Sequence, residues 1–226
     1  MVIEKPARLN HLATDHRGFI VPWFVQWFKD GKGSAYGEGE PDFRCADERK
    51  FHRALKEKRC WVCGDKLGVH LAFVIGPMCA VNKVTSEPPC HLECAEYSVR
   101  ICPFLSRPRM RRNEHDLPEQ RIEAPGVHLK RNPGTICIWV TRSYQTFRPE
   151  IGQDGLLINL GPTDRVRWYC EGRAATRAEV ETSLATGLPA LIEVAKQQGG
   201  DAPAALYADM ASVRALLPTG PDAGHA

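Results

Sequence analysis

Apolar positions in the first part of the chain cluster into short runs that predict strands. Phe19–Phe28 is dense in aromatic and β-branched residues, which favours a strand, and Pro22 within it lacks an amide donor. That strand is therefore expected at a sheet edge or at a bulge. The glycine-rich stretch Asp30–Pro41 is expected to close a hairpin onto Asp42–Cys45, and Val69–Ile75 has the continuous apolar pattern of a buried strand.

Two helices are predicted beside these strands. Asp47 is a favoured N-cap residue, so we expect a helix from it to about Lys58, with Phe51 and Leu55 on one face. A second helix is predicted over Pro89–Ile101 from its helical spacing of apolar residues. Strands and helices mixed in this way indicate an α+β fold.

The second part of the chain begins with strands and ends with helices. β-Branched and aromatic residues predict strands over Thr135–Thr141, Leu156–Leu160 and Arg165–Tyr169.

Three helices are expected after those strands. Thr176 and Glu179 form a capping-box pattern that starts the first one, and Gly187 is expected to stop it. Pro189 is expected to open the next helix, because proline is tolerated in a first turn. A last helix is predicted from Asp201, with an apolar stripe made of Leu206, Met210, Val213 and Leu217.

Composition narrows the class of protein without identifying it. The chain has 226 residues with 43% hydrophobic and 25% charged side chains, and its formal net charge of +3 is too small to mark a nucleic-acid binder. Residues 1–10 lack the apolar core of a secretory signal, and the longest apolar run, Leu71–Val81, is shorter than the ~20 residues of a membrane-spanning helix. We therefore expect a cytoplasmic protein without a membrane partner, in which nine cysteines stay reduced and favour metal binding.

Two cysteine-rich motifs form the strongest chemical signal. Cys60 and Cys63 stand in a C-x-x-C-G knuckle, in which Gly64 permits the tight turn behind two thiolates that face one ion. His91 and Cys94 are three residues apart at a predicted helix N-terminus, so they share a face. Three thiolates and one imidazole suit a closed tetrahedral site, and we expect one structural Zn²⁺ in a treble-clef-like arrangement.

Spacing alone leaves one ligand open. Cys90 and Cys94 also share a helical face, so Cys90 could replace His91 in the set. Cys79 is near enough in the chain to be a substitute ligand. The other cysteines are expected to be small buried hydrophobes, namely Cys45, Cys102, Cys137 and Cys170.

The least periodic stretch of the chain divides it into two parts. Residues 100–131 carry eight basic and four acidic side chains, and we interpret residues 107–126 as a linker or surface loop. We expect a zinc-binding α+β domain over residues 1–106 and a strands-then-helices α+β domain over residues 127–218. Residues 219–226 are expected to be a disordered tail.

Four arginines in six residues mark the most basic point of that stretch. Arg107, Arg109, Arg111 and Arg112 could contact phosphate groups of a nucleic acid or a charged protein partner. Alternatively they form a solvated loop that pairs with the acids beside it, Glu114, Asp116 and Glu119.

A nuclease of the His-Asn-His type is the enzymatic alternative, because such enzymes often use zinc knuckles as a scaffold. His70, Asn82 and His91 occur in the required order, with His70 as the catalytic candidate. Against this, His91 suits a zinc ligand better, and a packed His70 and a turn-forming Asn82 explain the same residues.

The stretch Leu71–Met110 resembles a family of uncharacterised proteins found in actinobacteria, other bacteria and their phages. The resemblance extends over four further segments, Asp15–Phe28, Pro41–Arg44, Arg142–Tyr144 and Gly172–Pro189. It implies a treble-clef-like pattern that matches Cys60, Cys63, His91 and Cys94. The phage association implies a non-enzymatic accessory protein that binds a protein or a protein–DNA assembly, such as a recombination directionality factor for a serine integrase.

Overall fold

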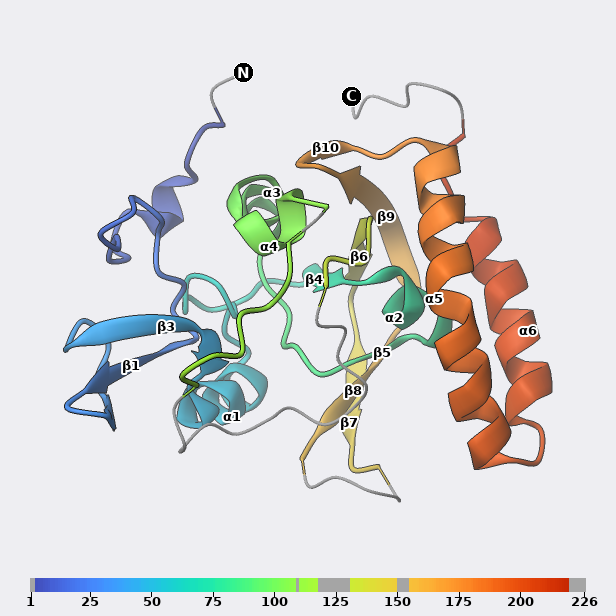
Figure 1. The fold of residues 1–226 in the computed structure, drawn as a ribbon, viewed down its shortest axis with the longest axis horizontal. Helices are drawn as coiled ribbons and strands as arrows, with labels where there is room; N and C mark the ends of the chain where they lie inside the picture. Colours follow the sequence, from blue (N-terminus) through green and yellow to red (C-terminus); the bar gives the residue numbers. More distant parts are fainter. Residues whose placement is uncertain (1–2, 109, 118–130, 150–154, 220–226) are drawn as a thin grey trace.

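The computed structural model (Figure 1) describes residues 3–108, 110–117, 131–149 and 155–219. The chain forms three antiparallel sheets with helices around them, so the α+β class is confirmed. After the short 3-10 turn η1 (Ala7–Leu9), the first sheet has strand order β2-β1-β3. Its strands are β1 Val25–Lys29, β2 Lys32–Ser34 and β3 Glu40–Ala46.

The first sheet confirms the predicted hairpin but shortens its first strand. β1 pairs with both β2 and β3, so it is the central strand and not the expected edge strand, although its register shifts between Val25 and Gln26 as at a bulge. It begins at Val25 instead of Phe19. Ile20 makes only an isolated bridge to Thr14. Pro22 lies between that bridge and the strand and has no amide hydrogen to continue the ladder, so regular pairing starts only after it.

Helix α1 (Glu48–Glu57) begins and ends where the sequence predicts. Asp47 is its N-cap, and its carboxylate accepts a hydrogen bond of 3.0 Å from the Arg49 amide. Lys50, on the first turn, donates a hydrogen bond of 3.2 Å from Nζ to the carbonyl of Val25. This buried contact fixes α1 against the first sheet.

The central sheet has strand order β10-β9-β6-β4. Its members are β4 Leu71–Ile75, β6 Ile136–Thr141, β9 Thr163–Cys170 and β10 Arg173–Ala174. β4 pairs with β6 from Leu71↔Thr141 to Ile75↔Cys137. Residues before and after the expected linker therefore share one sheet. Every residue of β6 is buried, which explains its uninterrupted apolar sequence.

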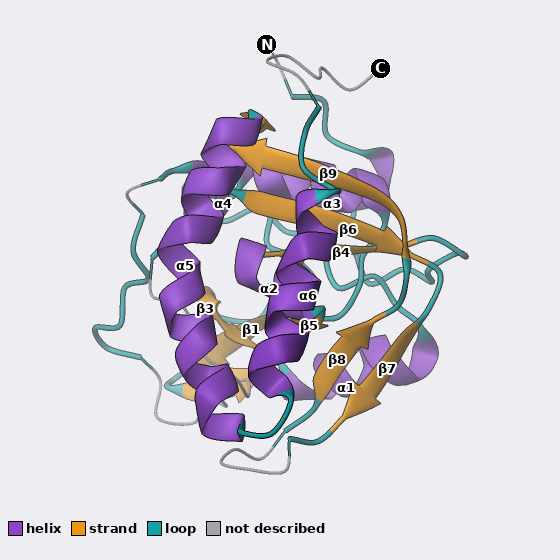
Figure 2. Ribbon diagram, turned by 90° about the vertical axis from the view of Figure 1, so that its right-hand side faces the viewer, coloured by secondary structure: helices purple, strands orange, loops and turns teal. Residues whose placement is uncertain are grey.

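The two faces of the central sheet are covered by different layers. Alternate residues of the strands, including Phe73, Trp139 and Trp168, pack on one face against helices α2 (Pro77–Asn82), α5 (Arg177–Gln198) and α6 (Ala202–Arg214). Figure 2 shows α5 and α6 side by side in front of this face. The intervening residues, including Ala72 and Ile138, face helix α3 (Leu92–Ile101), which is followed by α4 (Pro103–Ser106).

A third, smaller sheet has the order β5-β8-β7. Its strands are β5 Val84–Thr85, β7 Tyr144–Phe147 and β8 Leu157–Leu160. Here too a strand from before the expected linker, β5, pairs with one from after it, β8. The strands predicted in the second part of the chain are confirmed as β6, β8 and β9, whereas β7 and β10 were not predicted.

The two helices expected around Gly187 and Pro189 are instead one helix, α5, which runs through both residues. A Cβ at position 187 would come within 2.8 Å of the Met78 side chain on α2, so glycine lets the two helices approach closely. Pro189 is exposed and removes one backbone hydrogen bond. Packing of α5 on α2 and α6 holds the helix together across this defect, so glycine marks a close contact here and not a helix end.

The remaining expectations concern the ends of elements. The predicted strand Val69–Ile75 begins at Leu71, and the side chain of Val69 is exposed. The last helix is confirmed, with Leu206, Val213 and Leu217 buried. Of the expected tail, residues 220–226 lie outside the described residues. None of the described helices is both long enough and apolar enough to span a membrane.

The first test concerns the start of α5. The Thr176 side chain accepts a hydrogen bond of 3.3 Å from the Glu179 amide, and Glu179 accepts one of 2.8 Å from the Thr176 amide. A hydrogen bond from Arg173 lowers the pKa of Glu179 to about 2, so this carboxylate is ionised at neutral pH. We expect Thr176→Ala to lower the free energy of unfolding by about 1 kcal/mol in a urea titration at pH 7.

Thr182 provides a matched control on the same helix. Its hydroxyl donates to the Ala178 carbonyl and the residue is exposed, so Thr182→Ala should leave stability unchanged or raise it slightly. Equal effects of the two substitutions would contradict a capping role for Thr176.

Candidate metal centre

The first two donor atoms come from the turn between α1 and β4. In this turn the Cys60 amide donates to the Asp65 carbonyl over 2.8 Å, and the Gly64 amide donates to the Cys60 carbonyl over 2.8 Å. Gly64 has φ +81°, and a Cβ there would lie 2.7 Å from the Trp23 ring. Only glycine adopts this φ and fits beside the Trp23 ring without strain. The glycine of the sequence C-x-x-C-G is therefore required for this knuckle.

The other two donor atoms come from the start of α3. His91 is the N-cap residue of this helix, and Cys94 lies in its first turn. The Ala95 amide donates to the His91 carbonyl over 2.9 Å, which fixes the backbone that carries both side chains. The His91 amide itself lies 3.4 Å from Cys60 Sγ, so it points at the sulfur of the first motif.

These four residues form one compact cluster. One donor atom each from Cys60, Cys63, His91 and Cys94 lies within 4.8 Å of all the others. Cys63 Sγ and His91 Nδ1 are 3.4 Å apart. In a tetrahedral site with bonds of about 2.3 Å to sulfur and about 2.0 Å to nitrogen, neighbouring donors lie roughly 3.3–3.8 Å apart. The cluster therefore fits a single metal ion, as the sequence predicts.

The orientation of His91 assigns a role to each ring nitrogen. Nδ1 faces Cys63 Sγ, and Nε2 lies 3.0 Å from the Lys66 carbonyl oxygen. A carbonyl can only accept a hydrogen bond, so Nε2 carries the proton and Nδ1 is the nitrogen that is free to bind a metal. The hydrogen bond to Lys66 also fixes the plane of the ring.

The side chains of the cluster share their protons unevenly. Burial opposes ionisation of Cys60, but hydrogen bonds from the Cys63 and Cys94 side chains and from two backbone amides hold its pKa well below the usual range of a thiol. The same hydrogen bonds with Cys60 and Cys63, together with burial, raise the pKa of Cys94. Negative charge thus collects on Cys60 while a neighbouring thiol stays protonated, and a divalent cation would displace that proton.

A layer of contacts that the sequence did not predict covers the cluster. Arg8 forms an ion pair with Glu93 in the first turn of α3, and its Nη1 lies 3.4 Å from His91 Nε2. His11 donates from Nε2 to the Cys63 carbonyl over 3.0 Å. The N-terminal segment thus contacts both metal-binding motifs. No local pattern marks Arg8 or His11, because their partners lie more than fifty positions away in the chain.

Cys90 and Cys79 are not ligands in this arrangement. Cys90 Sγ donates to the Ala72 carbonyl over 3.2 Å, and the two residues form a β-bridge, so the backbone turns this thiol toward β4. Cys79 packs with Cys137 in the core below α2. The structure thus favours His91 as the fourth ligand.

Of the other cysteines, Cys45 and Cys137 are buried as expected, whereas Cys79, Cys102 and Cys170 are half-buried. Burial raises the pKa of the thiols of Cys79, Cys102, Cys137 and Cys170. A raised pKa keeps a thiol protonated at neutral pH and makes it a poor nucleophile.

The basic stretch is divided between a structural and an exposed part. Arg112 donates to the carbonyl of Arg44 at the edge of β3, so it holds the following segment to the first sheet. Arg44 in turn donates to the carbonyl of His115 over 2.6 Å. Arg107 and Arg111 are exposed, and Arg109 lies outside the described residues.

The residues of the nuclease alternative each have a separate partner. His70 is exposed, with Nε2 3.8 Å from a carboxylate oxygen of Asp164, which also pairs with Arg142. Asn82 accepts a hydrogen bond of 3.0 Å from the Val84 amide and so forms the turn after α2. His91 belongs to the metal cluster. Asn82 thus has a role in a turn, and His91 has a place in the cluster.

Comparison of the chain with family models, curated proteins and solved structures finds no match in any of the three. The geometry of the cluster therefore carries the functional argument.

The cluster makes a direct prediction about metal content. Cys63→Ser should lower both the metal-to-protein ratio from about one and the thermal midpoint, because metal binding at such a site is coupled to folding. Elemental analysis and calorimetry of the purified protein measure the two quantities. Cys90→Ala is the matched control, since it removes a buried thiol that does not belong to the metal-binding cluster and should keep the ratio near one. Unchanged metal content in Cys63→Ser would contradict the site.

Arg8 should control how readily the ion leaves. Arg8→Ala removes the contact between the N-terminal segment and α3, and we expect metal transfer to a chromogenic chelator to accelerate about 10-fold. Arg17→Ala is the control, because Arg17 belongs to the same segment but pairs with Asp15. Equal rates of transfer from the two variants would show that Arg8 does not protect the site.

Proposed function

We propose that the cluster holds one structural Zn²⁺ and that the protein is a non-enzymatic binding module. The complete donor set carries this proposal, because three sulfurs and one imidazole nitrogen occupy all four positions of a tetrahedral zinc ion. A zinc ion held in this way has no open position for the water molecule that hydrolytic zinc enzymes activate. The knuckle followed by two ligands at a helix start supports a treble-clef-like description of the site.

The position of the cluster supports a structural role for the ion. Cys60, Cys63 and Cys94 are fully buried and belong to the same apolar cluster as Ile138 of the central sheet. An ion bound there would join the knuckle to α3 and both to the back of the sheet. Its binding energy would therefore contribute to folding.

The proposed activity is contact with a protein or a protein–DNA assembly in the cytoplasm. Its support is the resemblance to phage-associated proteins, together with exposed arginines beside the metal-bearing helix. The proposed partner is a serine integrase, with this protein acting as a recombination directionality factor. Exposed hydrophobic side chains such as Val69 and Tyr207 offer additional contact surface.

The test combines binding and cleavage measurements on the zinc-loaded protein. We expect immobilised protein to retain a serine integrase from the native host, and we expect Cys63→Ser to lose this retention together with its zinc. Plasmid cleavage that requires Mg²⁺ or Mn²⁺ and disappears in His70→Ala would instead favour the nuclease. Zinc-loaded protein that retains no recombinase and cleaves no plasmid would refute both the binding-module hypothesis and the nuclease hypothesis.

A further inference from the structure

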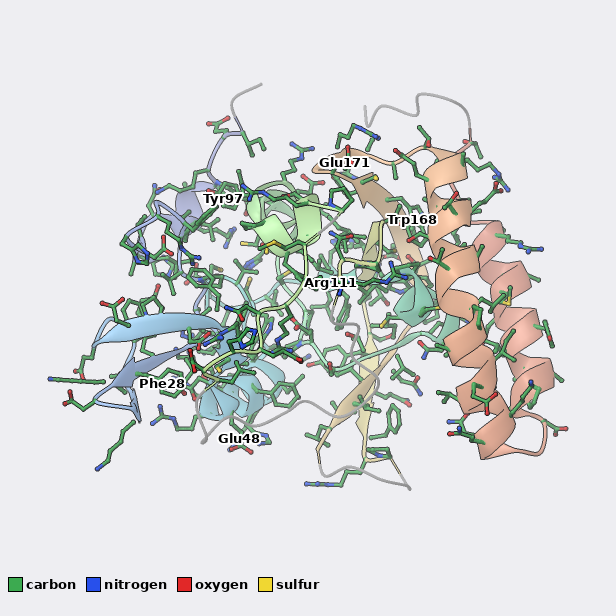
Figure 3. The ribbon with its side chains drawn as sticks, in the orientation of Figure 1. Phe28, Glu48, Tyr97, Arg111, Trp168 and Glu171 are labelled. Carbon is green, nitrogen blue, oxygen red and sulfur yellow. The ribbon has the colours of Figure 1, made fainter. Side chains whose placement is uncertain are left out.

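Two arginines from distant parts of the chain face each other on the surface. Arg111 follows α4, and Arg131 precedes β6; the two residues form an isolated antiparallel bridge. The Asn132 amide donates to the Met110 carbonyl over 2.9 Å. This hydrogen bond flanks the bridge, so Arg111 and Arg131 are a non-hydrogen-bonded pair, in which facing Cα atoms lie only about 4.5 Å apart and side chains leave the same face. Figure 3 labels Arg111 on this segment.

The backbone that carries this pair is held in place by a buried asparagine. Asn132 is 2% exposed. Its Nδ2 donates to the carbonyls of Phe104 and Leu105 over 2.7 and 3.1 Å, and its Oδ1 accepts from the Gly134 amide over 2.7 Å. The backbone beside the opposed arginines is therefore anchored to the end of α4 by side-chain hydrogen bonds.

Like charges directly opposite each other destabilise a strand pair. Both side chains are exposed, and no ion pair among the described residues involves Arg107, Arg111 or Arg131. Asp116, in the same segment, lies near Arg44 and raises the pKa of that arginine, where Asp42 has the larger effect. Within the part of the chain that the structure describes, the two facing arginines are therefore a like-charged pair that no ion pair offsets.

We infer that Arg111 and Arg131 are a two-pronged contact for backbone phosphates of DNA, with Arg107 beside them. Guanidinium groups bind phosphate oxygens through parallel hydrogen bonds, and a bound phosphate would remove the repulsion between them. Two surface cavities of about 390 and 400 Å³ are lined by other residues and not by these arginines. An open basic surface suits an extended polyanion better than a small anion that needs enclosure. The inference deepens the proposed function and rests on it for the choice of DNA.

The test is the salt dependence of binding to a fluorescent 30-base-pair duplex by the zinc-loaded protein. Each phosphate contact that is lost reduces the slope of log K against log salt by about 0.9. We expect a reduction of about 0.9 for Arg111→Ala and for Arg131→Ala, and of about 1.8 for the double variant. Arg177→Ala is the matched control, because it removes one exposed arginine that pairs with Glu181 on α5 and should leave the slope unchanged.

A charge reversal separates loss of folding from loss of contact. Arg111→Glu should place opposite charges across the bridge, so its thermal midpoint should rise by roughly 2 °C while DNA binding falls. A wild-type protein that does not bind the duplex at 50 mM salt, or variants that keep its slope, would overturn the inference. Inorganic phosphate that binds through the same arginines while the duplex does not would also overturn it. Zinc content and integrase retention are measured on the wild-type protein and on Cys63→Ser, so failure of the DNA contact and failure of the proposed function are distinguishable.

Discussion

Convergence of three thiols and one imidazole from two short segments is the constraint on which the first part of the structure depends. The knuckle and the start of α3 lie about thirty residues apart in the chain, and the cluster brings them together behind the central sheet. Without an ion, buried thiols with shared protons would occupy this point. Apolar burial alone would not specify their geometry, because it has no preferred direction. Four bonds to a tetrahedral metal ion would specify that geometry.

The central sheet divides the protein into two cores. Residues of β4 and β6 alternate between the helical layer of α5 and α6 and the layer that contains the cluster. A one-residue shift of β4 against β6 would place Phe73 in the layer of the thiols and Ala72 in the layer of the helices. The register of this pair is therefore set on both faces at once, by large side chains on one and by the metal-binding layer on the other. Pairing of β4 with β6 also makes the segments on either side of the expected linker interdependent.

Local features of this protein could be predicted from its sequence, and long-range ones could not. The knuckle, the N-cap of α1 and the capping box of α5 depend on neighbouring residues, and all three were found. Gly187 was misjudged because its role depends on Met78, which is remote in the chain. The covering contacts of Arg8 and His11 were missed for the same reason. His91 and Cys90 could be distinguished only when the bridge between Cys90 and Ala72 showed which way each side chain points.

The metal centre and the arginine pair are linked by one continuous segment. α3 starts at the ligands His91 and Cys94, and α4 follows it directly; carbonyls of α4 bind Asn132, which lies next to Arg131. Loss of metal would release the start of α3, and any displacement of this helix would pass through α4 to Asn132. A structural ion can in this way determine the spacing of surface charges that it does not touch. Any coupling of metal binding to the arginine pair would then run through the contacts of α3 and α4 with Asn132 and not through direct electrostatics.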